Sequence, residues 1–402
     1  MGVNNNYDIV IVGAGAIGCC AAIELAENHE VLVLEKDQFA TSASANANAF
    51  VSDWWYLLQG DRTPGVFKTM REFFNELDGT GDFKYNQHPC LIMIDEEENM
   101  DDPKNKFRKM RDSTEEIEGV SYHDRDDLEE RWSESLNLEG FSGGIVDEKA
   151  GCISPVSYLQ AMKMEAESRG TEFRMETEVT EIVTENDTIT GVTIENSTEE
   201  IRSDSIVVAA GTHSKKLLSD YTDLPIRPFV IYGNRIQPKH INTDEAPITS
   251  GRGMFVGPDP YGSLTLVGGE YWIDDFEEID EIPEEFPDEA REHVASRLPQ
   301  LFSGFESESD IEYVPGEIHR CPEGITITPD QLPVIDTVGG FDNLVVADGS
   351  RGAVSMAPAI STVIRTLITG ERTQIPLELF EIDRFESGTS EFDLPIITEP
   401  PT

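Results

Sequence analysis

The sequence predicts an α/β fold with a parallel sheet, because a strand, a helix and a second strand follow one another near residue 7. Residues 7–12 form an apolar run interrupted only by Asp8, which is typical of a strand buried on both faces of a parallel sheet. An alanine-rich segment at 17–27 has the composition of a helix, and residues 31–35 form a second apolar strand. This order indicates a βαβ unit.

The turn between the first strand and the helix carries glycines at three spaced positions, Gly13, Gly15 and Gly18. In a GxGxxG turn the first glycine permits the bend, the second lets a pyrophosphate approach the backbone, and the third lets the helix pack on the strand. The pyrophosphate would lie on the helix N-terminus, at Ala16 and Ile17. The turn therefore predicts a Rossmann-like dinucleotide site.

An acidic residue at the end of the second strand strengthens this prediction. Glu35 follows Gly13 by 22 residues and is succeeded by Lys36. A carboxylate in this place accepts hydrogen bonds from both hydroxyls of a ribose. The alternative, a solvated strand end, explains the acid but not the turn before it.

Later segments extend the dinucleotide domain and interrupt it twice. A helix is predicted at 157–169, buried strands at 205–210 and 344–347, and a helix at 355–369 that Gly370 closes as a C-cap. The two intervening regions are richer in acids, aromatics and alternating patterns, which favours mixed α+β structure. We expect a discontinuous dinucleotide domain at 1–70, 145–225 and 325–385, an interwoven substrate domain at 71–144 and 226–324, and a surface tail at 386–402.

The charge of the chain is extreme. It has 78 acidic and 30 basic residues, a formal net charge of −48 and a pI of about 4.2. The acids are spread over the whole length, and only eleven of the basic residues are lysines. Such a surface repels nucleic acid and anionic membranes and indicates adaptation to strong salt, that is, a halophilic host.

Cysteine and hydropathy patterns exclude several classes of protein. Five cysteines are an odd number without CxxC or His/Cys ligand spacing, so neither a disulfide scaffold nor a metal site is expected. No apolar run approaches the roughly 18 residues that span a bilayer. A polar lead of six residues precedes the first strand, so we expect a cytoplasmic protein without a membrane span.

Five stretches together resemble one known family, the D-amino-acid oxidase, glycine oxidase and sarcosine oxidase superfamily, or DAO-type flavoproteins, which also includes D-amino-acid dehydrogenase. The resemblance covers nearly the whole chain. The stretches are 8–18 with Glu35-Lys36, the loop 41–47, 147–155 with its following helix, 179 through 206–211, and Thr328-Pro329-Asp330 with 349–358.

The resemblance implies FAD as the cofactor and assigns it binding residues. In this family the loop after the second strand contacts the pyrophosphate, a valine brackets the adenine, an Ala-Ala-Gly strand end approaches the cofactor, and a C-terminal glycine turn closes over the flavin ring. These roles fall on Ser42, Ser44, Asn46, Ala47, Val179, Ala210, Gly211, Gly349, Ser350, Gly352, Ala353 and Val354. Cys321 is two residues too far from Asp330 for the covalent link that some members make, so non-covalent FAD is expected.

The sequence departs from the family where the substrate is held. The family usually carries an arginine five residues before the Asp of its TPD-like motif, and here that position is Ile325. Arg320 or Arg351 replaces this carboxylate clamp, or the substrate has no carboxylate. His319 and Tyr232 are the polar groups expected nearest the flavin.

The resemblance implies oxidation of a small amine or amino acid by hydride transfer from the carbon next to nitrogen to flavin N5, giving an imine that hydrolyses. Oxygen and a quinone-linked carrier both stay open as electron acceptors. A FAD-dependent dehydrogenase of 2-hydroxy acids or glycerol 3-phosphate would share the cofactor motifs. The Ser-Arg-Gly turn also resembles that of a flavin oxidoreductase of tRNA wobble-uridine modification, although the net charge argues against a tRNA partner. A non-catalytic FAD-binding subunit would lack only the clamp.

The charge predicts that stability increases with salt. At low ionic strength the unscreened negative charges repel one another in the folded state, whereas at 1 M salt the Debye length falls to about 3 Å. The melting temperature should therefore rise from millimolar to molar KCl. A thermal melt at each salt concentration measures this, and a flat or falling series would contradict the salt-adapted interpretation.

Overall fold

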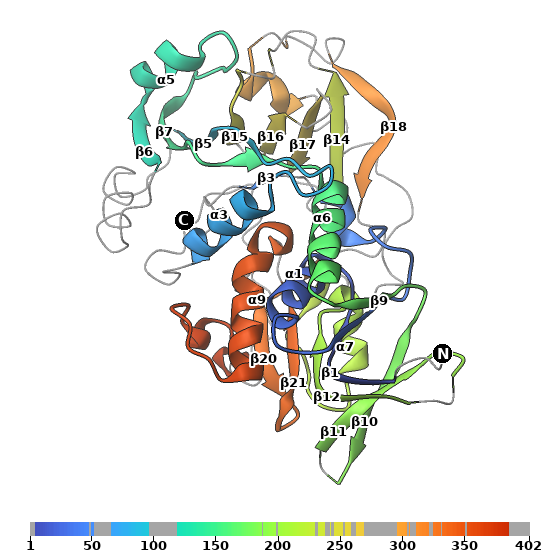
Figure 1. Cartoon of the computed structure of the whole chain (residues 1–402). Coiled ribbons are helices and arrows are strands. Elements are labelled where there is room, and N and C mark those ends of the chain that lie inside the picture. The colour runs from blue at the N-terminus through green and yellow to red at the C-terminus, as the bar shows by residue number, and fades with distance from the viewer. Residues whose placement is uncertain are drawn as a thin grey trace.

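The fold is given by a computed structural model, which describes most of the chain. The described residues are 5–47, 50–51, 66–95, 119–186, 188–197, 200–229, 232–237, 242, 245–251, 254–258, 263–268, 296–303, 305, 311–320, 325–330, 332–349 and 352–385. Figure 1 shows two parts stacked on each other, each built on one large sheet.

The first sheet has a parallel core with β1 at its centre. Its parallel strands follow the order β9-β2-β1-β12-β21, and antiparallel strands extend it at β20 and at the β10-β11 hairpin. This arrangement confirms the predicted α/β fold class. The bounds are β1 Asn6–Val12, β2 Val31–Leu34, β9 Glu172–Arg174, β10 Val179–Glu185, β11 Thr188–Ile194, β12 Glu200–Val208, β20 Val334–Val338 and β21 Phe341–Asp348.

The apolar run at residues 9–12 of β1 is explained by burial on both faces. Ile9 and Ile11 pack in one core cluster with helices α1 (Ala16–Leu25), α6 (Pro155–Ser168) and α9 (Ala353–Thr369). Val10 and Val12 face the opposite cluster, beneath the β10-β11 hairpin. A strand that alternates between two apolar cores needs apolar residues at every position.

The predicted elements differ from the observed ones mainly at their ends. The helix predicted at 17–27 ends at Leu25, and the strand predicted at 31–35 ends at Leu34, so that Glu35 follows the strand. The helix predicted at 355–369 begins two residues earlier, at Ala353. Gly370 adopts a left-handed conformation with φ of 71° after α9, which confirms its prediction as a C-cap.

The second sheet combines strands from two distant regions of the chain. Its order is β18-β14-β17-β16-β15-β5-β7-β6, and helix α5 (Arg125–Trp132) packs on it through Leu128 and Trp132. We propose that the two regions together form the substrate domain. The bounds are β5 Cys90–Asp95, β6 Val120–Asp124, β7 Phe141–Asp147, β14 Tyr232–Gln237, β15 Ile248–Gly251, β16 Met254–Pro258, β17 Leu264–Gly268 and β18 Glu312–Arg320.

Two smaller sheets and several short helical turns complete the described chain. One sheet pairs β3, β8 and β4, and the other pairs β13 with β19. Their strands are β3 Phe50–Val51, β4 Asn86–Gln87, β8 Gly151–Cys152, β13 Arg227–Phe229 and β19 Ile325–Ile327. The short helices are η1 Ala43–Asn46, η3 Gly211–His213, α7 Ser214–Leu217, η6 Leu377–Leu379 and η7 Ile382–Arg384.

Helix α3 (Val66–Leu77) joins the two parts (Figure 1). Phe74 stacks on Tyr158 of α6 with ring centroids 5.1 Å apart. From the same helix, Arg71 Nη2 lies 3.0 Å from Asp147 Oδ1 at the end of β7, and the two side chains are only 18% and 3% exposed. A largely buried ion pair therefore ties the second sheet to the helical layer of the first.

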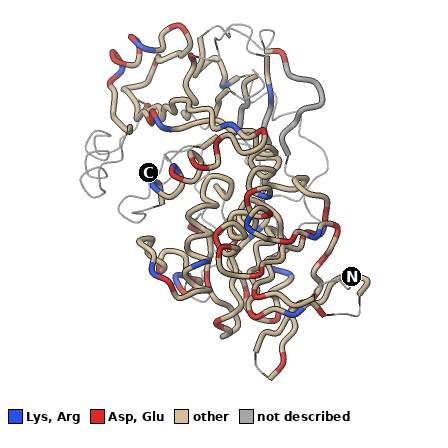
Figure 2. Tube along the Cα trace, viewed as in Figure 1, with Lys and Arg blue, Asp and Glu red and all other residues tan. Residues whose placement is uncertain are grey.

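Acidic residues are distributed over both parts of the described chain (Figure 2). Several of the basic side chains pair with acidic ones at the surface, as in Arg125 with Glu129 and Arg131 with Glu148. Among the helices that the structure describes, none is long and apolar enough to cross a bilayer.

The buried pair predicts a large loss of stability on removal of its acid. Asp147→Ala would leave the Arg71 guanidinium without its 3.0 Å partner, so the free energy of unfolding should fall by about 3–5 kcal/mol. Glu129→Ala, which breaks the exposed Arg125–Glu129 pair, is the matched control and should cost about 0.5 kcal/mol or less. Urea titrations in molar salt give both values, and equal losses would show that burial does not govern the pair.

Candidate functional site

A cavity of about 620 Å³ opens at the carboxyl ends of the parallel strands. Its wall includes the ends of β1, β2, β12 and β21, the start of β10, and parts of α7 and β19. Ligands of open α/β sheets bind at this edge, and the volume lies within the range of about 300–1,000 Å³ of cofactor and ligand pockets.

The glycine turn forms one side of the cavity by close backbone contacts. Gly13 has a φ of +105°, and a Cβ there would lie 2.3 Å from the carbonyl oxygen of Ala209. A Cβ on Gly18 would lie 1.9 Å from the Gly13 oxygen, so Gly18 serves helix packing and lies off the cavity wall. At Gly15 a Cβ would meet only Ser44 Oγ, at 3.1 Å, and would otherwise extend into the cavity.

Glu35 fastens the second strand to the turn. Its Oε2 accepts a hydrogen bond of 2.8 Å from the Ala14 amide, and its Oε1 accepts one of 3.1 Å from the Asp37 amide. Each carboxylate oxygen has a further lone pair, so both can still accept from ribose hydroxyls. Lys36 also borders the cavity, and its Nζ lies 3.0 Å from Asp37 Oδ2.

The loop after β2 covers the helix N-terminus. Ser44 Oγ accepts a 3.0 Å hydrogen bond from the Ala16 amide, and Ser42 and Ser44 both border the cavity. Asn46 instead donates to the carbonyl oxygens of Thr41 and Ser42, at 3.1 and 3.0 Å, and thereby shapes the loop. Asn46 and Ala47 do not themselves line the wall.

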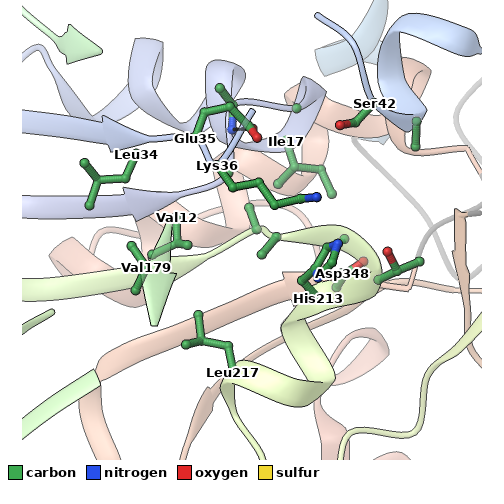
Figure 3. A pocket seen from close by; sticks show the side chains of 18 of the residues that line it. Val12, Ile17, Leu34, Glu35, Lys36, Ser42, Val179, His213, Leu217 and Asp348 are labelled. Carbon is green, nitrogen blue, oxygen red and sulfur yellow. Dashed lines mark hydrogen bonds between the residues drawn. The ribbon is translucent and has the colours of Figure 1, made fainter. Parts of the chain in front are cut away.

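The cavity has an apolar end and a polar end (Figure 3). Val12, Leu34, Val179 and Leu217 gather at one end, whereas His213 and Asp348 lie at the other, and the Lys36 side chain reaches between them. An apolar slot suits the flat faces of an adenine ring. A dinucleotide can therefore extend from the apolar end, past the glycine turn, to the polar end.

The C-terminal glycine turn lies beside the polar end. Gly349 is buried with a φ of +80°, and a Cβ there would lie 2.5 Å from Thr328 Cγ2. Ala353 borders the cavity at the start of α9, while Gly352 is the N-cap of that helix and, like Val354, lies off the wall. Ser350 lies outside the described residues.

Three of the four residues proposed for catalysis lie on two paired strands. In the register of β14 and β18, Tyr232 is opposite Arg320 and Gly233 is opposite His319. Arg351 lies outside the described residues. Ile325, the family's clamp position, borders the cavity at the start of β19.

The structure adds residues to the cavity wall that the sequence motifs did not indicate. His213, Lys216 and Leu217 reach it because the chain turns through η3 and α7 directly after the Ala-Ala-Gly strand end. Asp348 is the last residue of β21, much as Glu35 directly follows β2. An acidic residue at the end of a buried strand was therefore the sequence signal that could have indicated Asp348. Burial raises the pKa of the Asp348 carboxyl, and hydrogen bonds from Ser214 and Thr326 oppose that rise.

No group of three or more His, Cys, Asp or Glu side chains within the described chain is arranged to hold a metal ion. The four cysteines that the structure describes are buried, and none borders the cavity; Cys321 lies outside the described residues. Burial raises the thiol pKa of Cys19 and Cys20, which makes them poor nucleophiles.

The open space at Gly15 predicts a graded loss of cofactor. Gly15→Leu should weaken FAD binding by about tenfold or more, because its side chain fills space that the pyrophosphate needs. Gly15→Ala adds one methyl group and should lose much less. Flavin absorbance per chain in the purified proteins measures both, with the melting temperature of each FAD-free protein as the folding control. Equal flavin content in wild type, Gly15→Ala and Gly15→Leu would show that the pyrophosphate does not bind at this turn.

Comparison with known proteins agrees with this geometry. The family profile described as "FAD dependent oxidoreductase", DAO, matches residues 8–366. Monomeric sarcosine oxidase from Bacillus sp. (strain B-0618) is 22% identical over 400 residues, covering 95% of this chain and 97% of the relative. Human peroxisomal sarcosine oxidase is 21% identical over 405 residues, 95% of this chain and 97% of the relative.

Solved structures share the fold over the same length. L-proline dehydrogenase from P. horikoshii has a TM-score of 0.79 at 18% identity and covers 96% of this chain and 99% of its own. Glycine oxidase from Geobacillus kaustophilus has a TM-score of 0.74 at 19% identity, with 95% and 100% covered. Because the family profile spans most of the sequence, the chain belongs to the DAO family of FAD-dependent oxidoreductases.

Proposed function

We propose that this flavoprotein oxidises a small amine or amino acid at the carbon next to nitrogen. The observation that carries the proposal is the likeness to monomeric sarcosine oxidase, which extends over 95% of the chain and includes both sheets. The substrate amine would become an imine, which water hydrolyses to a carbonyl compound and a free amine or ammonia.

The residues of the cavity suit non-covalent FAD. Glu35 would accept from the ribose, the turn at Gly15 would take the pyrophosphate, and Val179 with Leu217 would bracket the adenine. When bound, FAD supplies the acceptor for a hydride from the substrate carbon. The chain's own task is then to orient the substrate, bind its charge and exclude water.

Chain connectivity supports a substrate position between the cavity and the second sheet. Arg320 ends β18, and Ile325, five residues later, borders the cavity. Five residues span at most about 18 Å, so the β14-β18 end lies within that reach of the cavity wall. Tyr232 pairs opposite Arg320 at this same end.

The substrate clamp is proposed from the charges near this place. Ile325 cannot pair with a carboxylate, so we assign the clamp to the guanidinium of Arg351 or Arg320, unless the substrate lacks a carboxylate. Arg351 follows Asp348 by three residues in the sequence, and Asp348 borders the cavity. For that reason Arg351 is preferred over Arg320. The proposed mechanism needs no strong general base if the amine binds unprotonated.

A turnover screen tests the proposed function. The purified holoenzyme is mixed with amines, N-methyl amino acids, amino acids, 2-hydroxy acids and glycerol 3-phosphate, with oxygen uptake and artificial-dye reduction as parallel readouts. Amine or amino-acid turnover supports the proposal, and the two readouts separate an oxidase from a dehydrogenase. Turnover of only hydroxy acids or glycerol 3-phosphate, or of none, would overturn it.

The clamp predicts a substitution series on the active substrate. Arg351→Ala should lower kcat/KM by roughly 30- to 1000-fold, the equivalent of about 2–4 kcal/mol of lost charge-assisted binding, and should leave flavin content unchanged. Arg351→Lys should restore little, because an ammonium cannot copy the planar fork of a guanidinium. Arg320→Ala tests the second candidate.

Arg202→Ala is the matched control, because Arg202 is an exposed residue of β12 opposite Asn6, at the far end of the strands from the cavity. It should retain wild-type kcat/KM. Near-normal turnover of a carboxylate substrate by Arg351→Ala would show that Arg351 does not bind the substrate carboxylate.

A further inference from the structure

Asp348 is a buried acid in the wall of the cofactor cavity. It is the last residue of β21, is 3% exposed, and borders the cavity at the polar end beside His213 (Figure 3). A buried carboxyl group is costly to maintain unless hydrogen bonds compensate for lost hydration. The hydrogen bonds of Asp348 therefore show what stabilises this buried carboxyl group.

Asp348 contacts Ser214 and Thr326, which are distant from it in the sequence, and its own neighbour Gly349. Ser214 Oγ at the start of α7 donates to its Oδ2 at 2.5 Å, and Thr326 Oγ1 of β19 donates to its Oδ1. The Gly349 amide, in the C-terminal glycine turn, donates to Oδ1 at 2.7 Å. The carboxyl group thus holds together the three segments that enclose the polar end of the cavity.

The donors around Asp348 favour its ionised form. Ser214 Oγ accepts from the Ala210 amide at 3.2 Å, and Thr326 Oγ1 accepts from the Gly349 amide at 3.0 Å. Each hydroxyl has one proton, and within these described contacts the acceptor for both protons is Asp348. A protonated Asp348 would bring a third O–H proton to these two O···O contacts, so one of the three would lack an acceptor within them, whereas the ionised form leaves none.

Burial is the largest influence on the pKa of Asp348 and leaves that pKa raised. The hydrogen bonds from Ser214, Thr326 and Gly349 and the nearby His213 all oppose that rise. Among the described residues, no lysine or arginine forms an ion pair with it. The negative charge is therefore compensated chiefly by dipoles, and its field extends into the cavity.

We propose that Asp348 is a positioning residue that fixes the flavin-side wall and, as a buried carboxylate, makes the bound FAD harder to reduce. Reduction adds negative charge to the flavin, and a fixed anion in a poorly hydrated wall opposes that charge. The inference rests on the proposed placement of the flavin ring at this end of the cavity. It does not depend on which substrate is oxidised.

The test measures the reduction potential of the holoenzyme without substrate. Asp348→Asn keeps the shape and removes the charge, so its flavin potential, determined by equilibration with a reference dye, should shift to a more positive value. Sulfite is a second probe, because it adds reversibly to oxidised flavin and leaves negative charge on the ring. It should bind Asp348→Asn on the order of tenfold more tightly than wild type.

Asp336→Asn is the matched control. Asp336 lies on the neighbouring strand β20 and accepts backbone amides from Thr337 at 2.7 Å and Ile382 at 2.9 Å, but it does not border the cavity. Its potential and sulfite affinity should equal those of wild type. A wild-type potential and sulfite affinity in Asp348→Asn would overturn the inference, even if amine oxidation is found.

A second variant covers the case in which Asp348→Asn retains too little flavin for measurement. Thr326→Val keeps the carboxylate and removes one of its donors, so FAD binding should weaken by about 3- to 10-fold. Wild-type FAD affinity in Thr326→Val would overturn the positioning role. Absence of amine turnover in wild type, with the potential shift present, would reject only the proposed substrate class.

Discussion

The close approach of three backbone segments at the ends of β1 and β12 is the constraint on which the cavity depends. Because glycine has no side chain, Gly13 can lie against the Ala209 carbonyl and Gly18 can lie against Gly13. These contacts let α1 begin directly above β1, with its N-terminus aimed at the cavity. The Ala14 amide in the same turn then reaches Glu35, so strand β2 is held in register with the cofactor site.

Local patterns were sufficient to predict the parts of the site that lie close together in the sequence. The apolar run of β1, the glycine spacing and the acid after β2 are encoded within 30 residues, and the structure places Val12, Gly13, Gly15 and Glu35 at the cavity. The sequence also indicated Gly370, because a glycine after an apolar helix is the usual left-handed C-cap.

The rest of the site depends on tertiary contacts that no local pattern records. His213 and Asp348 become neighbours because β12 and β21 pair in parallel across more than a hundred residues, as in Ile206 with Leu344. The pairing of Tyr232 with Arg320 likewise needs the register of two strands separated by most of the second insertion. Sequence motifs named Arg320 and Tyr232 individually, but their adjacency follows only from the sheet.

The position of β21 has a consequence for how the chain folds during synthesis. Strand β12 pairs with β21, and α1 packs in one core with α9. The apolar faces of the amino-terminal βαβ unit are therefore covered only after residues 341–369 have been synthesised. Contacts of such long sequence separation slow folding and leave apolar surface exposed meanwhile. A ribosome would release nearly the whole polypeptide before this core could close, and the dense negative charge along the nascent chain would then limit its self-association.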